Sequence, residues 1–320
     1  MPIVAITDYT FPSLDIEETI LRASGAELLS GQCKTPEALI PLVSRADAVI
    51  TQFAPLTADV IAAMQKARVI VRYGIGGDNV DLAAARARGI PVCNVPEFCI
   101  DEVADHTLAF ILATTRNVLQ NSLHIRDGKW GLATSLDQMR TLRDQTLGIV
   151  GFGRIGREVA TRLAPFKCRR LVFDPVVPAA AIQAAGCEPV SFDSLLAQSD
   201  IVTFHCPSTP QTRKMLNADS IARMKRGAIV INLGRGDLVD SVSLVSALQS
   251  GHVAAAALDV FDIEPLPLDS PLRSLPNVIT ASHIASASVK AVRTLRETAA
   301  GIAAAALRGE VLPNVVNGVK

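Results

Sequence analysis

Short apolar runs alternate with amphipathic runs along most of the chain. In the first hundred residues the apolar runs predict strands at 3–6, 26–29, 48–51, 69–71 and 90–93. Helical segments are expected between them, for example at 16–23 and 82–88. Alternation of this kind is typical of a parallel sheet that carries helices on both faces.

A second alternating set begins near the middle of the chain. A long helix is expected over 101–117, followed by a polar stretch that holds the only tryptophan, Trp130. Strands are then predicted at 147–150, 171–173, 201–204, 228–232, 255–258 and 278–280, and an alanine-rich helix at 289–307. The pattern therefore predicts a second parallel sheet with its own helices.

The first strand of this second set runs directly into a glycine fingerprint, G-x-G-x-x-G. Gly151 allows a tight turn, and Gly153 lets the backbone approach a pyrophosphate. Gly156 lets the following helix pack closely on the strand, and the helix N-terminus faces the anionic phosphates. Asp174 ends the next strand, at the spacing of about 20 residues expected of an acid that binds a ribose diol. The segment predicts a dinucleotide site.

Six strands from the fingerprint onward match a complete dinucleotide-binding domain. We expect the final helix to cross back to the first set of strands. The predicted fold is α/β with two doubly wound parallel-sheet domains, a Rossmann dinucleotide domain inserted into a flavodoxin-like substrate domain. The substrate domain is expected to comprise residues 1–100 and 290–320, and the NAD-binding domain residues 101–289.

The composition narrows the class of protein. Hydrophobic residues make up 49% of the chain, and 31 basic residues balance 31 acidic ones, which argues against a nucleic-acid or membrane-surface partner. No apolar run reaches the roughly 18 residues of a membrane span, and residues 1–10 lack signal-peptide features. The six cysteines are scattered, without zinc-site spacing. We therefore expect a cytoplasmic protein with reduced thiols and no bound metal.

Several motifs, in the expected order, make the chain resemble the D-isomer-specific 2-hydroxyacid dehydrogenases over nearly its whole length. This family includes phosphoglycerate dehydrogenases and glyoxylate/hydroxypyruvate reductases. The motifs are Y-G-I-G-G-D-N-V-D at 73–81, the fingerprint at 151–156, H-C-P at 205–207, N-L-G-R-G at 232–236, A-L-D-V-F-D-I-E-P at 257–265 and H-I-A at 283–285. The run E-V-A-D-H at 102–106 is similar to a branch near the C-terminal-binding-protein corepressors.

Three residues are candidates for the chemistry of an NAD-dependent dehydrogenase. Arg235 follows a strand at its carboxyl end, and its planar fork suits a carboxylate. His283 follows the last strand and suits a proton donor and acceptor. Glu264 would stabilise the imidazolium form of His283. The resemblance implies that His283 protonates the keto oxygen during hydride transfer, while Arg235 holds the substrate.

The resemblance also implies the binding residues. The glycine loop is expected to give backbone N–H groups to the substrate carboxylate, in a cleft between the domains. The expected substrate-binding residues are Arg72, Tyr73, Gly74, Ile75 and Gly76. The expected NAD-binding residues are Gly151, Gly153, Arg154, Ile155, Gly156, Asp174, His205, Cys206, Pro207, Thr212, Leu233, Gly234, Asp259 and Ala285. Asp259 is also expected to support the catalytic residues.

The identity of the substrate stays open at this point. Arg72 resembles one phosphate-binding arginine of the phosphoglycerate enzymes, but Gln52 stands where they tend to carry another. The chain also ends at Lys320, before the regulatory domain of the longer enzymes. Small 2-keto acids such as glyoxylate or hydroxypyruvate are therefore favoured over a phosphoglycerate substrate. Glu264 argues against the formate enzymes, which carry glutamine there.

Two further alternatives concern partners. A dinucleotide-sensing binding protein that acts through partners would not need Arg235, Glu264 and His283, so their presence favours an enzyme. The stretch 121–143 is long, mixed in polarity and includes Trp130. In the resembling family the corresponding region packs across a twofold axis, so a homodimer is expected.

Overall fold

The computed structural model describes residues 1–319. The chain forms two compact units, the first from residues 1–99 together with the segment from Ser288 onward, and the second from residues 100–287. The first unit is therefore built from both ends of the chain, and the second is a continuous insertion.

The first unit contains a five-stranded parallel sheet with the strand order β2-β1-β3-β4-β5. This is the flavodoxin-like order 2-1-3-4-5, as predicted from the sequence. The strands are β1 (Ile3–Ile6), β2 (Glu27–Ser30), β3 (Ala48–Thr51), β4 (Ile70–Arg72) and β5 (Val92–Cys93). The central strands are buried at every position, which explains why they read as continuous apolar runs in the sequence.

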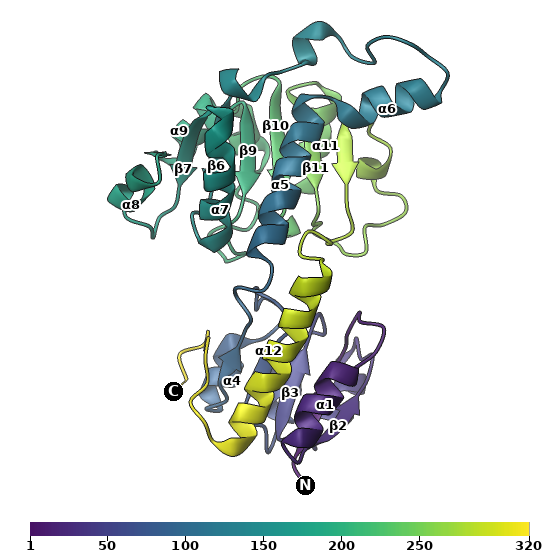
Figure 1. Ribbon diagram of the computed structural model, residues 1–320, viewed down its shortest axis with the longest axis vertical. Helices are drawn as coiled ribbons and strands as arrows, with labels where there is room; N and C mark the ends of the chain where they lie inside the picture. The colour runs from purple at the N-terminus through teal and green to yellow at the C-terminus, as the bar shows by residue number, and fades with distance from the viewer. Residues whose placement is uncertain (320) are drawn as a thin grey trace. The chain divides into compact units, whose positions relative to one another are not determined.

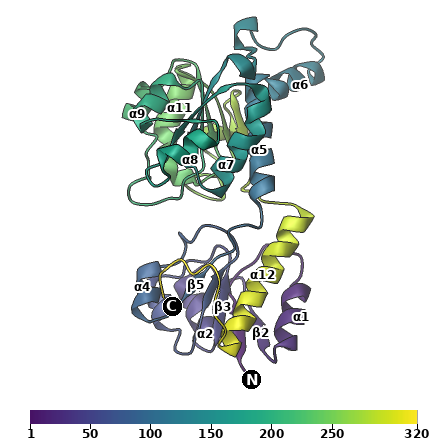
Figure 2. The same cartoon turned by 60° about the vertical axis from the view of Figure 1, so that its left-hand side comes forward.

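Helices cover both faces of this sheet. On one face α1 (Asp15–Ala23) and α12 (Val289–Arg308) lie side by side and share a hydrophobic core (Figures 1 and 2). On the other face lie α2 (Pro36–Val43), α3 (Ala58–Ala62) and α4 (Leu82–Ala87). The C-terminal helix α12 is thus an integral part of the first unit.

The second unit contains a seven-stranded parallel sheet with the order β12-β11-β10-β9-β6-β7-β8. The order reverses between β6 and β9, which is where open α/β sheets bind dinucleotides. The strands are β6 (Thr146–Val150), β7 (Arg169–Phe173), β8 (Glu188–Pro189), β9 (Ile201–Phe204), β10 (Ala228–Asn232), β11 (Val253–Leu258) and β12 (Val278–Thr280). The sequence predicted six of them; it missed β8, which is two residues long and contains a proline.

The helices of the second unit also occupy both faces. On one face α5 (Ile100–Thr115) packs beside α7 (Arg154–Leu163), as Figure 1 shows. On the other lie α9 (Phe192–Gln198), α10 (Ala218–Ala222) and α11 (Ser241–Gln249), with α8 (Ala179–Ala184) beside β8. The helix α6 (Val118–Arg126) follows α5, and short 3-10 helices span Leu136–Gln138, Leu142–Asp144, Ala164–Phe166, Gly236–Leu238 and Pro271–Arg273.

None of the helices within residues 1–319 is both long enough and apolar enough to cross a membrane. All six cysteines are free thiols. The same residues contain no group of three or more His, Cys, Asp or Glu side chains arranged to hold a metal ion.

Candidate functional site

The three catalytic candidates follow three adjacent strands of the second unit. Arg235 comes after β10, Glu264 lies in the loop after β11, and His283 comes after β12. Because the strands are parallel and neighbouring, their carboxyl ends meet at one edge of the sheet. The fold therefore collects these side chains from positions that lie far apart in the sequence.

His283 and Glu264 form a direct contact. The Nδ1 atom of His283 lies 2.8 Å from Oε2 of Glu264. The other carboxylate oxygen of Glu264 accepts a hydrogen bond of 2.9 Å from the backbone N–H of Phe261. Both oxygens are thus fixed, and the carboxylate in turn fixes the ring orientation of His283.

The electrostatics of this pair favour an ionised carboxylate. Burial alone raises the pKa of Glu264, because it disfavours the charged form. The hydrogen bond and charge of His283, the N–H of Phe261 and the charge of Arg235 outweigh burial, so the pKa of Glu264 lies below its usual range. Glu264 is therefore an anion that faces the imidazole at neutral pH.

Asp259 builds the loop that carries His283. Its buried carboxylate accepts the backbone N–H of Ile284 at 2.8 Å and that of Ala285 at 2.9 Å. Its carbonyl oxygen accepts the N–H of His283, whose φ of 58° lies in the left-handed region. These three bonds tie the end of β11 to the turn after β12 and hold His283 in an uncommon backbone conformation.

The turn that carries Arg235 is also fixed by its neighbours. The side chain of Asn232 accepts the N–H of Gly234 at 3.0 Å and donates to the carbonyl of Arg235 at 2.8 Å. A side chain at Gly236 would collide with the backbone of Phe261 and Asp262. The turn therefore packs directly on the loop that holds Glu264. Sequence reasoning gave Asn232 no role, although its buried position at the end of an apolar strand is a signal for one.

The glycine fingerprint forms the tight turn expected of it. Gly151 has a φ of 93°, and a Cβ atom there would lie 2.6 Å from the backbone nitrogen of Cys206. A Cβ atom on Gly156 would collide with the carbonyl of Gly151, so α7 packs closely on the turn. Gly153 instead faces open space. The fingerprint thus lies against the H-C-P loop, and Gly153 leaves room for a ligand beside the helix N-terminus.

Asp174 binds the same turn from the end of β7. Its Oδ2 atom accepts the N–H of Phe152 at 2.7 Å, and Oδ1 accepts the N–H groups of Val176 and Val177. Burial raises the pKa of Asp174, but these bonds and the charge of Arg157 lower it below its usual value overall. A carboxylate has about four lone-pair sites, so this anion keeps accepting capacity for a ribose hydroxyl.

Several alternative acid–base groups take other roles. His205 contacts the hydroxyl of Thr203 at 2.9 Å, and burial lowers the pKa of His205 to about 4, so the ring is neutral at pH 7. His252 contacts the carbonyl of Ile221 at 2.9 Å. The ring of His106 packs against Phe110. Among the ion pairs of residues 1–319, His283 is the histidine that contacts a carboxylate.

The H-C-P loop is held in place by hydrogen bonds within itself and to the segment after β10. Burial raises the pKa of Cys206 to about 11, so its thiol is not an activated nucleophile. Thr212 donates to the carbonyl of Pro207 at 2.7 Å, which closes the loop on itself. Ser208 donates to Asp237, next to the Arg235 turn, at 2.6 Å. Neither Ser208 nor Asp237 was singled out from the sequence, because the motifs around them end one residue earlier.

The glycine loop of the first unit is fixed through its carbonyl groups. Arg72 donates to the carbonyl of Tyr73, Val95 to that of Gly74, and Asn94 to that of Ile75. The N–H of Tyr73 is bonded to Thr51 and that of Gly74 to Arg72. The N–H groups of Tyr73 and Gly74 are therefore engaged within the first unit. Across residues 1–319, no hydrogen bond uses the N–H of Ile75 or Gly76.

The side chain of Gln52 forms hydrogen bonds within the first unit. Its Oε1 atom accepts the N–H of Thr10 at 2.8 Å, and its Nε2 atom donates to the Thr10 hydroxyl at 3.1 Å. The carboxylate of Asp8 accepts the backbone N–H groups of Gln52 and Phe53. Gln52 thus does not replace the cation that a phosphate group would require here.

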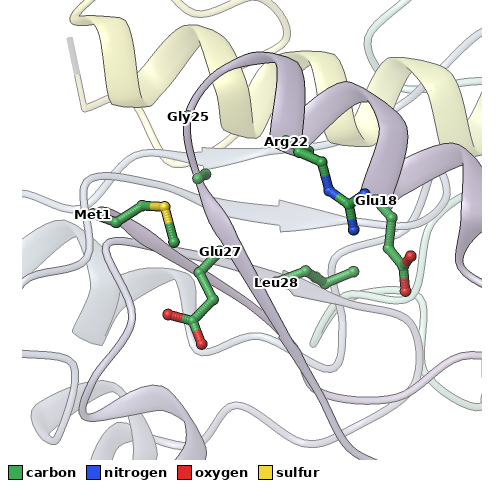
Figure 3. A pocket seen from close by; sticks show the side chains of 7 residues that line it. Met1, Glu18, Arg22, Gly25, Glu27 and Leu28 are labelled. Atoms are coloured by element: carbon green, nitrogen blue, oxygen red, sulfur yellow. The ribbon is translucent and has the colours of Figure 1, made fainter.

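A surface hollow of about 340 Å³ lies between α1 and the beginning of β2 (Figure 3). Met1, Glu18, Arg22 and Glu27 line it. It lies at the amino end of β2, whereas ligands of open α/β sheets bind at the carboxyl ends of strands. None of the predicted site residues lines this hollow.

Comparison with known proteins agrees with this geometry. The family model of the D-isomer specific 2-hydroxyacid dehydrogenase, NAD binding domain, matches residues 108–285. A glyoxylate reductase of Korarchaeum cryptofilum is 39% identical over 282 residues, which cover 87% of this chain and 85% of that protein. A D-3-phosphoglycerate dehydrogenase of Mycobacterium leprae is 39% identical over 280 residues, 87% of this chain but only 52% of that protein.

The structural comparison gives the same result. The crystal structure of D-lactate dehydrogenase from Aquifex aeolicus, complexed with NAD and lactic acid, has a TM-score of 0.90 and 27% identity. The match covers 98% of this chain and 99% of that one. The chain thus spans about half the length of its phosphoglycerate dehydrogenase relative and most of the other two. This protein belongs to the family of D-isomer-specific 2-hydroxyacid dehydrogenases and carries its NAD-binding domain.

Proposed function

We propose that this protein interconverts a D-2-hydroxy acid and the corresponding 2-keto acid with NAD as cofactor. The observation that carries the proposal is the 2.8 Å contact between His283 and Glu264, at the sheet edge that also presents Arg235. A proton donor and a carboxylate-binding cation are the two groups that reduction of a 2-keto acid requires from a protein.

The residues around the fingerprint fit a bound NAD. Gly153 provides open space for the pyrophosphate at the N-terminus of α7, and Asp174 provides an acceptor for the ribose. The H-C-P loop and the turn at Leu233 and Gly234 would lie along the rest of the dinucleotide. When bound, the nicotinamide supplies or accepts the hydride.

His283 serves as the acid in reduction and as the base in oxidation. With Nδ1 held by Glu264, the proton is exchanged with the substrate oxygen at Nε2, on the opposite edge of the ring. The negative charge of Glu264 stabilises the protonated ring before transfer. Asp259 keeps the ring in place, because it accepts hydrogen bonds from the backbone N–H groups of His283 and Ile284.

Arg235 binds the substrate carboxylate through its guanidinium group. Arg235 acts before and during hydride transfer, because it orients the keto carbon and polarises its oxygen. In the first unit, the N–H groups of Ile75 and Gly76 have no partner among the hydrogen bonds of residues 1–319, so they are suitable donors for a carboxylate. We assign the substrate-binding role to the N–H groups at 75 and 76 and to the guanidinium of Arg235.

We favour a small unphosphorylated 2-keto acid, such as glyoxylate or hydroxypyruvate, as the substrate. Two observations support this choice. The side chain of Gln52 is already hydrogen-bonded to Thr10, and the nearby carboxylate of Asp8 would repel a phosphate group. The presence of Arg72 keeps a phosphoglycerate substrate as the second candidate. We also propose that the protein acts in the cytoplasm, which its six free thiols support.

The first test is NADH oxidation over a panel of 2-keto acids that includes glyoxylate, hydroxypyruvate and phosphohydroxypyruvate. His283→Ala should lower kcat on the order of 10²- to 10⁴-fold, because a positioned acid is lost. Arg235→Ala should raise KM and lower kcat together. His252→Ala, whose ring contacts only a backbone carbonyl among the hydrogen bonds of residues 1–319, is the matched control and should keep near-parental kcat. Near-parental activity of His283→Ala would overturn the assignment.

The second test concerns pH. Glu264→Gln removes the anion that stabilises the protonated imidazole, so reduction should be lost at a lower pH than in the parent. The pH profile of kcat/KM measures this displacement. A profile with the parental midpoint would show that the His283–Glu264 contact does not control the proton.

The third test concerns the cofactor. The Asp174 carboxylate repels a 2′-phosphate, so kcat/KM with NADH should exceed that with NADPH by about tenfold or more. Arg169 begins the same strand but binds Glu188, so Arg169→Ala should keep the parental ratio. Equal or better kcat/KM with NADPH would contradict this assignment.

We further propose a homodimer formed through the region 118–136 of the second unit. This region projects from the body of that unit (Figure 1) and exposes an unusual number of large apolar side chains. They are Val118, Leu119, Leu123, Ile125, Trp130, Leu132 and Leu136. Trp130 is 93% exposed, which is costly for a ring of this size unless a partner covers it.

Light scattering at micromolar concentration should give about twice the chain mass of 33.9 kDa. Trp130→Glu should shift the mass toward that of the monomer, because it places a charge in the apolar contact. Val311→Glu changes an equally exposed apolar residue of the first unit and should leave the mass unchanged. A monomeric parent would refute the dimer.

A further inference from the structure

An ion pair is buried beneath the glycine loop of the first unit. The side chain of Glu17, in α1, is fully buried, and that of Arg296, in α12, is 8% exposed. Arg296 binds the Glu17 carboxylate through Nε at 2.9 Å and through Nη2 at 2.7 Å. Nη2 also donates to the carbonyl of Ser13 and to Asp15. The guanidinium therefore joins the C-terminal helix to the N-terminal helix.

Burial of this pair requires an explanation beyond stability. Removing two charges from water costs several kcal/mol per ion, and apolar residues of similar size often stabilise a core as well or better. Both helices that carry the pair also contribute apolar side chains to one hydrophobic core. We therefore expect Glu17 and Arg296 to have a role other than stabilising the folded protein.

The third member of this cluster is the phenol of Tyr73. Its hydroxyl donates a hydrogen bond of 2.9 Å to Oε1 of Glu17, the oxygen that also binds Nε of Arg296. The ring is 1% exposed and packs edge-on against Phe11, whose ring also lies under the guanidinium of Arg296. Burial, together with the charge of Glu17, raises the pKa of Tyr73, so the hydroxyl stays a donor.

Tyr73 connects this cluster to the loop for which we propose a role in binding the substrate carboxylate. It immediately precedes Gly74, whose φ of 141° marks the point where the chain leaves the sheet. The following two residues, Ile75 and Gly76, carry the unbonded N–H groups assigned to the substrate carboxylate. The side chain of Tyr73 therefore ties the start of the loop to the core of the first unit.

We propose that Glu17, Arg296 and Tyr73 form a buried anchor that positions the Ile75 and Gly76 N–H groups for the substrate carboxylate. The inference rests on the function proposed above, and it assigns Glu17 and Arg296 as positioning residues that never touch substrate. The ion pair holds the Glu17 oxygen that accepts the Tyr73 hydroxyl in one place. Because only Gly74 separates Tyr73 from Ile75, a fixed Tyr73 restricts the positions of the Ile75 and Gly76 N–H groups. Free loops must be ordered on binding, so a pre-ordered loop binds its ligand more tightly.

The first experiment compares Tyr73→Phe with the parent. The variant keeps the ring and removes one hydrogen bond to a buried charge, so KM for the 2-keto acid should rise roughly tenfold. We expect kcat to change less, by roughly threefold at most, and the Kd for NADH to stay parental, because NAD binds the other unit. Amide hydrogen exchange at residues 75–77 of the free protein should become faster.

The second experiment replaces the ion pair with apolar residues of similar volume, Glu17→Met with Arg296→Met. This double variant should fold, and it should raise KM about as much as Tyr73→Phe does. Adding Tyr73→Phe to it should raise KM no further, because the hydroxyl has already lost its acceptor. A full additional increase would overturn the anchor.

The matched control is Val43→Ala in α2, a buried position on the opposite face of the same sheet. It should lower Tm without changing KM or the exchange at 75–77. An equal rise in KM for Val43→Ala would show that the loop responds to general destabilisation, and would overturn the proposal. Parental KM and parental exchange in Tyr73→Phe would overturn it as well. If the parent reduces no 2-keto acid, the proposed function fails, and the exchange data alone decide for or against the anchor.

Discussion

The arrangement of the second unit depends on one buried carboxylate, that of Asp259. It accepts two backbone N–H groups from the segment after β12, and its own carbonyl accepts a third from His283. The two bonds to the carboxylate are strong because this acceptor is charged and water is excluded. The three bonds hold the backbone of His283 at a φ of 58°, and with it the imidazole beside Glu264. The contact between His283 and Glu264 therefore depends on the backbone at this edge of the sheet and not on two side chains alone.

Close backbone approaches complete that edge. Gly151 brings the fingerprint turn against the H-C-P loop, and Gly236 brings the Arg235 turn against the loop that carries Glu264. Neither position has space for a Cβ atom, so the loops pack as backbone on backbone. A bulkier residue at position 151 would push the fingerprint turn away from the H-C-P loop, and one at position 236 would push the Arg235 turn away from the Glu264 loop.

Much of the fold was predictable from the sequence, because strands and the glycine fingerprint are encoded in short, continuous segments. Buried parallel strands appear as apolar runs, and the fingerprint reports a strand, a turn and a helix together. Features that depend on distant partners were not predictable. The hydrogen bond from Tyr73 to Glu17 joins residues 56 positions apart, and the bond from Arg296 to Glu17 joins residues 279 apart. The sequence predicted a backbone role for Tyr73 in substrate binding, and it gave no sign that the Tyr73 side chain lies in the core.

The same limit applies to the strand β8 and to the roles of Asn232 and Asp237. A strand of two residues is too short to show an alternating pattern in the sequence. The role of a polar side chain at a strand end can be assigned only when its hydrogen-bond partners are known. The catalytic candidates were predictable because residue type alone restricts the choice of an acid–base group and a carboxylate-binding cation. Their mutual distances were not, and these distances are what the chemistry requires.

The most direct measurement is a crystal structure of the protein with NADH and oxamate, an unreactive analogue of a 2-keto acid. The account predicts that the oxamate carboxylate binds Arg235, with the amide carbonyl oxygen of oxamate within hydrogen-bond distance of Nε2 of His283. Binding of the carboxylate to another cation, or an oxamate oxygen that is out of reach of His283, would contradict it.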